Sequence, residues 1–156
     1  APKHVQQFVK EGHLRWESLG EFLALSESFA HLKQVKGNTK AQVLAETLDR
    51  ATGKLMENKK SPGRTVGDLD NAGTHIYEAL YWAKELAAQD DDADLKAKFA
   101  PVAEQLESKI DTIFDEMNAS NGQAKDIGGY YRTDPGKVAQ AMRRSATFNS
   151  ILDSLN

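Results

Sequence analysis

The sequence contains no cysteine, so disulfide bonds, thiolate metal ligands and thiol nucleophiles are all excluded. Long apolar runs are missing too: the longest covers residues 79–83, whereas a helix needs about 20 apolar residues to span a bilayer. There is no excess of positive charge, because 20 Lys and Arg stand against 23 Asp and Glu and give a net charge of -3. We therefore expect neither a nucleic-acid partner nor a membrane partner. The absence of cysteine is compatible with a reducing cytoplasm, where we expect the protein to lie.

The composition is that of a protein that folds. Of the 156 residues, 40% are hydrophobic and 28% are charged, which is an ordinary globular balance. This length predicts one domain over residues 1–156. The first residues, Ala-Pro-Lys-His, include neither an initiator methionine nor the apolar core of a signal peptide. We therefore expect Ala1 to be a cut made in a longer chain.

Apolar residues recur at spacings of three and four along most of the sequence, a pattern typical of α-helices. No alternating run long enough to indicate a strand is present, and no internal repeat of 20 to 50 residues. The fold class is therefore expected to be mainly α, with about six or seven helices. The first three expected helices cover about 2–11, 19–36 and 39–55. A fourth has its apolar positions at 76–87 and a fifth at 95–117, and two short helices follow Asp134.

Capping residues predict where several of these helices begin. Ser18 with Glu21, and Thr39 with Gln42, have the spacing of a capping box. Gly37 is expected to end the helix between them, which makes the second and third helices an antiparallel hairpin.

Two later helix starts are also marked. The aspartates at 90, 91, 92 and 94 favour the positive end of a helix, and we prefer this interpretation to a metal site. Asp134 followed by Pro135 is typical of an N-cap and a first helical residue. Pro101 is expected to kink or interrupt the fifth helix.

Periodicity disappears over about residues 58–73. This stretch holds the basic residues Lys59, Lys60 and Arg64 together with one proline and several glycines. Loops of this length are usually functional or disordered, and we expect this loop to be functional.

No complete catalytic motif and no pair of histidines at metal-ligand spacing is present. What remains is a group of basic residues in a chain of negative net charge, namely His4, His13 and Arg15 near the first turn and Lys59, Lys60 and Arg64 in the long loop. Arginine binds phosphate through two parallel hydrogen bonds, and histidine adds another donor. Taken singly, each of these residues is more typical of an ordinary surface position than of a ligand contact. The aromatic residues are more typical of a core or an interface than of base stacking, namely Trp16, Tyr77, Tyr81 and Trp82.

Several separated strings, in one order over essentially the whole chain, resemble a known family. They are APKHVQQFVKEGHLRWESLGEFLAL, NKKSPGRTVGDLDNAGTH, EALYWAKELAAQ, DIGGYY and AMRRSATFN. They are similar to the C-terminal part of the monomeric NADP-dependent isocitrate dehydrogenases.

This resemblance implies a helical segment that completes the small domain of a larger α/β enzyme, which oxidises isocitrate to 2-oxoglutarate with NADP. It implies that the ligands of isocitrate and of Mg or Mn lie upstream, so that this segment carries no catalytic residue and no metal ligand and is inactive alone. His4 and Arg15 match positions that engage the 2′-phosphate of NADP. Arg64 matches a further cofactor-binding position, and Glu17 stands where the family usually has an aspartate near the cofactor.

Two other positions depart from the family. Ala72 stands where an arginine is common, and Gly63 stands where a serine is usual. The partners implied are the upstream remainder of the enzyme, NADP and isocitrate. The alternatives are a free-standing, non-catalytic helical binding module derived from this family, or a regulatory or assembly role for the two aromatic-rich helices.

Overall fold

The structure is a computed structural model and describes residues 2–155. Over that range it contains eight α-helices and, apart from an isolated bridge between Val66 and Asp68, no extended pairing. None of these helices is both long and apolar enough to cross a bilayer. The mainly-α prediction is thus confirmed. The helices are α1 (Pro2–Glu11), α2 (Leu19–Lys36), α3 (Thr39–Glu57), α4 (Asn71–Ala88), α5 (Ala93–Ser108), α6 (Ile110–Asn118), α7 (Pro135–Met142) and α8 (Ala146–Asp153).

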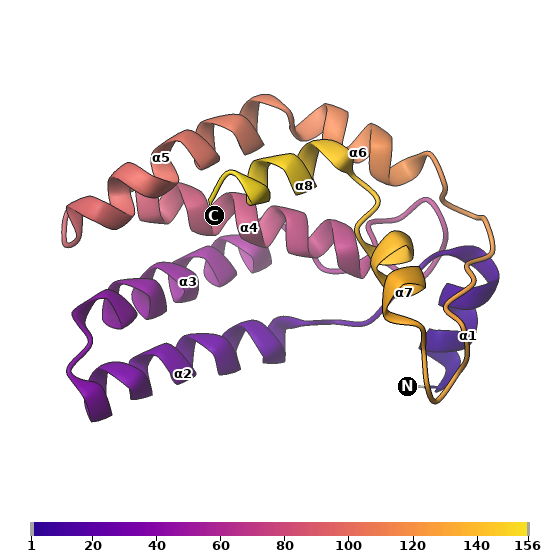
Figure 1. Ribbon diagram of the computed structural model, residues 1–156, viewed down its shortest axis with the longest axis horizontal. Helices are drawn as coiled ribbons and strands as arrows, with labels where there is room; N and C mark the ends of the chain where they lie inside the picture. Colours follow the sequence, from indigo (N-terminus) through magenta and orange to yellow (C-terminus); the bar gives the residue numbers. More distant parts are fainter. Residues whose placement is uncertain (1, 156) are drawn as a thin grey trace.

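Helices α2 and α3 form the expected antiparallel hairpin (Figure 1). Gly37 ends α2 in the left-handed conformation, with φ of 66°, and donates its N–H to the carbonyl of Lys33. Glycine adopts this conformation without a steric penalty from a Cβ atom, so the chain can reverse here.

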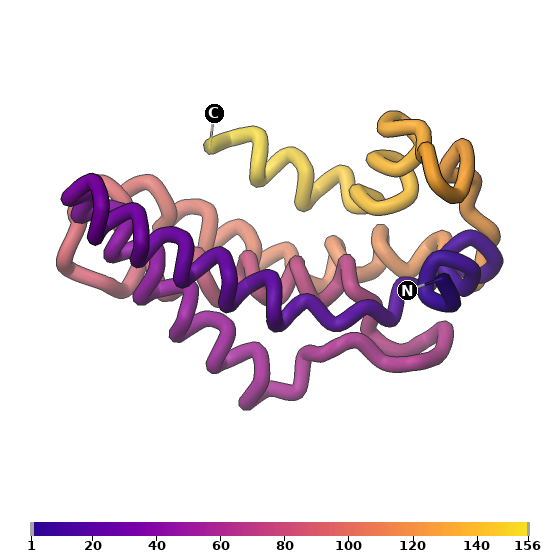
Figure 2. The backbone as a smooth tube through the Cα atoms, turned by 90° about the horizontal axis from the view of Figure 1, so that it is seen from below, coloured from indigo at the N-terminus to yellow at the C-terminus, as the bar shows by residue number. Residues whose placement is uncertain are grey.

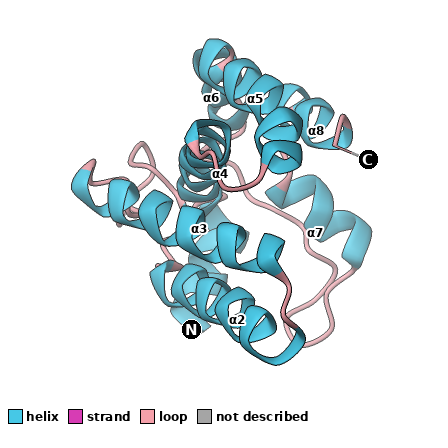
Figure 3. Cartoon of the chain, turned by 90° about the vertical axis from the view of Figure 1, so that its left-hand side faces the viewer, coloured by secondary structure: helices cyan, strands magenta, loops and turns pink. Residues whose placement is uncertain are grey.

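Helix α4 lies in the middle of the molecule. It packs against α3 on one side and against α5 on the other, and α8 lies along α5 and α6 (Figures 1 and 3). The expected central place of this helix is confirmed. The main hydrophobic core joins α4, α5, α6 and α8 through Ile76, Leu80, Ala83, Val102, Ala103, Leu106, Ile113, Met117 and Ile151.

A second, smaller core lies at one end of the molecule. It joins α1 to α7 through Phe8, Ile127 and Ala141. Figure 2 shows both helices at this end, and the loop between α3 and α4, which covers residues 58–70, lies next to α1. This end of the molecule carries the residues discussed in the next section.

The expected fifth helix is two helices, which is why the total exceeds the predicted six or seven. Pro101 lies inside α5 and does not interrupt it. The break comes at Lys109, where φ is -109° and ψ is 9°. Proline has no N–H to donate to the carbonyl four residues earlier in the helix. Pro101 is exposed, so water can donate to that carbonyl instead.

The capping box predicted for α3 is wrong. Asn38 is the N-cap, because its side chain accepts from the N–H of Ala41 at 3.1 Å. Thr39 is already helical, and Gln42 donates to Glu46 at 2.9 Å instead of reaching back to the helix start. Asparagine is among the best N-cap residues, so it takes the position one residue earlier.

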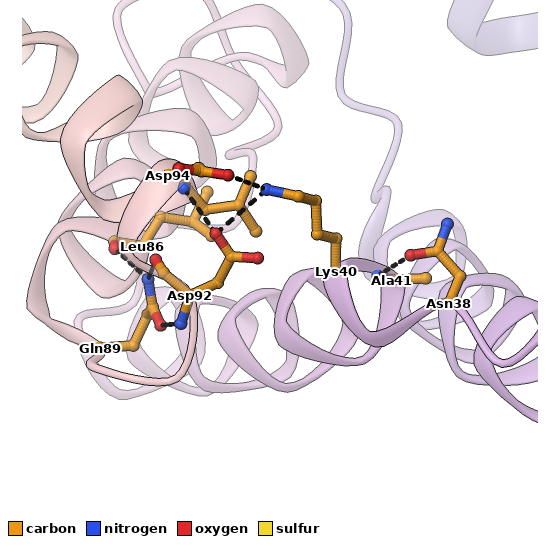
Figure 4. A network of polar contacts seen from close by, with 8 residues as sticks. Asn38, Lys40, Ala41, Leu86, Gln89, Asp92 and Asp94 are labelled. Atoms are coloured by element: carbon orange, nitrogen blue, oxygen red, sulfur yellow. Dashed lines mark hydrogen bonds and ion pairs between the residues drawn. The ribbon is translucent and has the colours of Figure 1, made fainter.

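The aspartate run does cap a helix, as predicted. Asp92 accepts from the N–H of Leu95 at 2.9 Å and thereby begins α5. Lys40 donates to Asp92 at 3.2 Å and to Asp94 at 3.0 Å, which links the beginning of α3 to that of α5 (Figure 4). Asp134 caps α7 in the same way, through the N–H of Lys137 at 2.9 Å, and this prediction is also confirmed.

Candidate functional site

The segment between α1 and α2, residues 12–18, lies against the N-terminus of α4. The backbone N–H of Asn71 donates to the carbonyl of Leu14 at 2.7 Å. Its side-chain amide donates to the carbonyl of Trp16 and to the hydroxyl of Ser18, both at 2.8 Å. Asn71 is 5% exposed, so these bonds are shielded from competing water. The first residue of α4 therefore holds the segment that contains Arg15 and Glu17.

The capping box predicted for α2 is also wrong, because both of its side chains bond to other residues. The hydroxyl of Ser18 accepts from Asn71 and makes no cap bond. The carboxylate of Glu21 accepts from the indole N–H of Trp16 at 2.8 Å, and this bond is the main reason why the pKa of Glu21 is lowered. Both box residues thus stabilise the connecting segment rather than the helix start.

A buried ion pair lies beneath this segment. Arg144, from the connection between α7 and α8, pairs with Asp70, and their side chains are 6% and 8% exposed. The same guanidinium donates to the side chain of Asn121 at 3.0 Å and to the carbonyl of Gly12 at 3.4 Å. Asp70 also caps α4 by accepting from the N–H of Gly73 at 2.8 Å. These bonds hold the ends of α1 and α6 against the beginning of α4.

The tip of the loop 58–70 is a closed turn. The N–H of Gly63 donates to the carbonyl of Leu69 at 2.8 Å. The carboxylate of Asp68 accepts from the N–H and hydroxyl of Thr65, at 3.1 and 2.8 Å, and these bonds lower the pKa of Asp68. A Cβ atom at Gly63 would overlap the side chain of Asp68. The turn in this form therefore requires glycine at position 63.

Two side chains connect this turn to α1 and the segment after it. The imidazole of His13 donates from Nε2 to the carbonyl of Gly63 at 3.0 Å, which places the ring proton on Nε2, since a carbonyl only accepts. The side-chain amide of Gln7 donates to the carbonyl of Arg64 at 2.9 Å. The backbone of Arg64 is thereby held beside α1, although 57 residues separate Gln7 from it.

His4 lies on α1, three residues before Gln7, and so on the same face of the helix. Its ring packs edge-on against Trp16, with the ring centroids 5.6 Å apart. Burial lowers the pKa of His4, and the positive charge of Arg15 contributes to the same shift. Nδ1 of His4 and Nε of Arg15 are both buried without a hydrogen-bond partner. The structure thus places His4 and Arg15 close together, each with a nitrogen atom that is free to form a hydrogen bond.

Neither Arg15 nor Arg64 forms a salt bridge with any residue in the range 2–155. This differs from Arg50 and Arg144, which are each paired with a buried carboxylate. The uncompensated charges lie on the segment 12–18 and on the neighbouring loop, both next to the face of α1 that carries His4. This arrangement can bind an anion.

Glu17 lies on the same segment but is already engaged. Its carboxylate accepts from the backbone N–H of Leu19 at 3.1 Å, at the first residue of α2. Carboxylates are favourable in the first turn of a helix, where N–H groups lack partners. Glu17 therefore supplies the stabilisation of α2 that Ser18 does not.

Comparison with known proteins identifies the family. The profile of the family described as "Monomeric isocitrate dehydrogenase" matches residues 1–153. The chain belongs to this family. It is 55% identical over 155 residues to "Isocitrate dehydrogenase [NADP] 2" of Colwellia maris, a match covering 99% of this chain and 21% of that protein. It is 53% identical, with the same coverage, to "Isocitrate dehydrogenase [NADP]" of Azotobacter vinelandii. For "Isocitrate dehydrogenase [NADP] 2" of Mycobacterium tuberculosis the identity is 50%, again over 99% of this chain and 21% of the relative.

The chain thus spans 21% of the length of these relatives. Within residues 2–155, no three His, Asp or Glu side chains come together in an arrangement that could hold a metal ion. Trp16, expected in a core or an interface, is 40% exposed and lies beside His4. Tyr77 and Tyr81 do pack against the main core.

Sequence reasoning missed three residues that support this region, namely Gln7, Asn71 and Arg144. His13 was expected among the basic residues, but its bond to the carbonyl of Gly63 was not. Asp70 and Asn71 precede a helical pattern and could have been named as a cap. The other contacts join residues separated by 23 to 132 positions. A local pattern in a single sequence does not indicate which distant residues form such pairs.

Proposed function

We propose that this chain is the part of an NADP-dependent isocitrate dehydrogenase that recognises the 2′-phosphate of the coenzyme. His4 and Arg15 bind the phosphate, and Arg64 approaches the coenzyme from the loop 58–70. Glu17 contributes a weaker contact from the same segment, since its carboxylate already accepts from Leu19. Relatives named as NADP isocitrate dehydrogenases support this assignment.

One observation carries the proposal: Arg15 and Arg64 have no carboxylate partner among residues 2–155, although acidic residues outnumber basic ones in the chain. Arginines without a partner next to a histidine provide positive charge and hydrogen-bond donors, which a phosphate requires. The buried nitrogen atoms of His4 and Arg15 that lack a partner support the same conclusion.

The 2′-phosphate is the feature that distinguishes NADP from NAD, so these residues would set the coenzyme preference. A hydrogen bond to a charged group contributes about 1.5 to 3 kcal/mol. Since about 1.4 kcal/mol corresponds to a factor of ten in affinity, two such contacts support a preference of about 10²-fold or more.

The remaining chemistry is assigned to the rest of the enzyme. Residues outside this chain would bind isocitrate and Mg or Mn, and NADP accepts the hydride when isocitrate is oxidised and decarboxylated. This chain would therefore be inactive alone. The proposal includes a cytoplasmic location, in keeping with a metabolic enzyme that needs no disulfide.

Calorimetric titration of the full-length enzyme with NADP and with NAD tests the proposal. We expect the double variant His4→Ala, Arg15→Ala to bind NADP about 10²-fold more weakly, and its NAD affinity to change less than about threefold. Arg64→Ala should weaken NADP binding about tenfold.

The matched control is the double variant His31→Ala, Lys36→Ala. It also removes one histidine and one cation, but both are exposed and lie on α2. The control should retain the wild-type preference. Full retention of the preference in the His4→Ala, Arg15→Ala variant would show that these residues do not recognise the 2′-phosphate.

A further inference from the structure

We propose that Gln7 and His13 are positioning residues that hold the loop carrying Arg64 at the distance from α1 at which its guanidinium can bind the coenzyme. This inference rests on the proposed function, because it concerns the same site. Neither residue is assigned a direct contact with the coenzyme. Their role is to fix two successive backbone carbonyls, those of Gly63 and Arg64.

The turn has few other attachments. Within residues 61–69, the backbone and side-chain hydrogen bonds are formed inside the turn, apart from those donated by Gln7 and His13. At the two ends of the loop, the carbonyl of Lys60 accepts from Thr74 and Asp70 caps α4. The turn is thus rigid within itself, but its position relative to α1 depends on these two donors.

The two donors reach the turn from separate elements. Gln7 lies on α1 and is half-buried, whereas His13 lies in the segment 12–18 and is 2% exposed. Two bonds to neighbouring carbonyls restrain both the distance and the orientation of the turn, whereas one bond would leave a hinge. The guanidinium of Arg64 has no salt-bridge partner in residues 2–155. The position of its backbone therefore determines where the guanidinium lies.

Gln7 also couples Arg64 to His4. The two residues are three positions apart on α1, so a donor to the loop and a candidate phosphate ligand share one helix face. Side chains that bind a ligand must be held within about 0.5 Å of the required position, and the residues that contact those side chains or their backbone hold them there. Loss of either donor should therefore weaken NADP binding although no coenzyme contact is removed.

Steady-state kinetics of the full-length enzyme test this role. Gln7→Leu keeps the size of the side chain but removes the donor. We expect it to raise the KM for NADP about tenfold while kcat and the KM for isocitrate stay unchanged. His13→Leu should have the same effect, and His13→Gln should restore most of the affinity, because the amide of glutamine keeps an N–H donor. Gln42→Leu is the matched control, since Gln42 is exposed and donates to Glu46 on α3.

The background of Arg64→Ala separates positioning from a general structural effect. If Gln7 acts through Arg64, Gln7→Leu should cause no further loss once Arg64 is alanine. An equal tenfold loss in both backgrounds would overturn the inference, as would an unchanged KM for NADP in Gln7→Leu. Since Gln7 is only half-buried, this variant serves if His13→Leu fails to fold.

The two proposals fail in different ways. If Arg64→Ala weakens NADP binding but Gln7→Leu does not, only the positioning role is wrong. If Arg64→Ala itself leaves NADP binding unchanged, the assignment of Arg64 to the coenzyme is wrong, and the positioning role falls with it.

Discussion

At the scale of single residues, the surroundings of His4 determine its charge before any ligand binds. Burial lowers the pKa of its imidazole below the ordinary value of 6.5, and the neighbouring Arg15 adds to the shift. The ring is therefore mostly neutral near pH 7 in the free protein. A phosphate placed beside it would favour the protonated ring, so its pKa should rise on binding.

The difference between the pKa of His4 in the free protein and in the complex predicts a pH dependence of coenzyme binding. Between the lower pKa of the free protein and the higher pKa of the complex, binding takes up a proton, so affinity should increase as pH falls. We expect the ratio of NADP affinities of wild type and His4→Gln to grow as the pH is lowered from 8 to 6. Calorimetry on the full-length enzyme in buffers of different ionisation heat measures the proton uptake. A ratio that does not change with pH would contradict a phosphate contact by His4. Titration of the phosphate itself cancels in this ratio.

At the scale of elements, the interface between α3 and α4 contains a buried carboxyl group that has a hydrogen bond to only one of its two oxygens. Glu78 on α4 is 3% exposed, and one of its oxygens accepts from the hydroxyl of Thr52 on α3 at 2.6 Å. The other oxygen is buried without a partner. Burial raises the pKa of Glu78 to about 7, and the bond from Thr52 opposes this shift only in part. The neighbouring Glu85 differs, because it is paired with Arg50 and Lys54 and its pKa is lowered.

The raised pKa of Glu78 makes the helix pair less stable as the pH increases. In the unfolded chain this carboxyl has its ordinary pKa of 4.5, so between pH 4.5 and about 7 folding takes up a proton. Stability should be highest below this window, fall through it and level off above it. We expect Glu78→Gln to be more stable than wild type by about 1 to 3 kcal/mol at pH 8, and the difference to vanish towards pH 4.5.

Urea unfolding monitored by circular dichroism at several pH values measures this difference. Glu104→Gln, which changes an exposed glutamate on α5, is the control and should show no such trend. A stability difference of equal size at pH 5 and pH 8 would show that Glu78 does not titrate in this window.

The helices and their ends show how much of the fold can be predicted from a single sequence. Helical periodicity located the helices, and local caps such as Asp92, Asp134 and Gly37 were found because their partners lie within four residues. The capping box at α2 failed because its side chains bond elsewhere: Ser18 to Asn71, and Glu21 to Trp16. The break at Lys109 likewise has no residue that commonly ends a helix, whereas Pro101, which does, lies within α5.

The candidate site was predictable only in part. His4, Arg15 and Arg64 were named from their chemistry and from resemblance to a family. Their proximity depends on contacts that cross 50 or more residues, such as the bond from His13 to Gly63. Such contacts arise from how the helices pack, so the residues that support the site became visible only in the structure.

At the scale of the whole molecule, Arg144 connects the site to the helical body. Its bonds reach the end of α1, the turn after α6 and the cap of α4. It therefore joins the end formed by α1 and α7 to the end of the main core at α4. Because both Arg144 and Asp70 are more than nine-tenths buried, loss of one charge leaves the other without compensation.

We expect Arg144→Met to destabilise the protein by about 3 kcal/mol, because it leaves Asp70 buried and unpaired. Asp70→Asn keeps an oxygen for the cap bond to Gly73 and should cost less than an alanine at this position. The double variant should lose less stability than the sum of the two single variants, with a coupling of about 1 to 3 kcal/mol in urea unfolding. Arg132→Met is the control, because Arg132 is exposed and forms no salt bridge within residues 2–155.

Since Arg144 also holds the carbonyl of Gly12, Arg144→Met should weaken NADP binding by the full-length enzyme as well. Additive losses in the double variant would mean that the pair does not act as one unit, and unchanged NADP binding would separate the stability of the helical body from the geometry of the site.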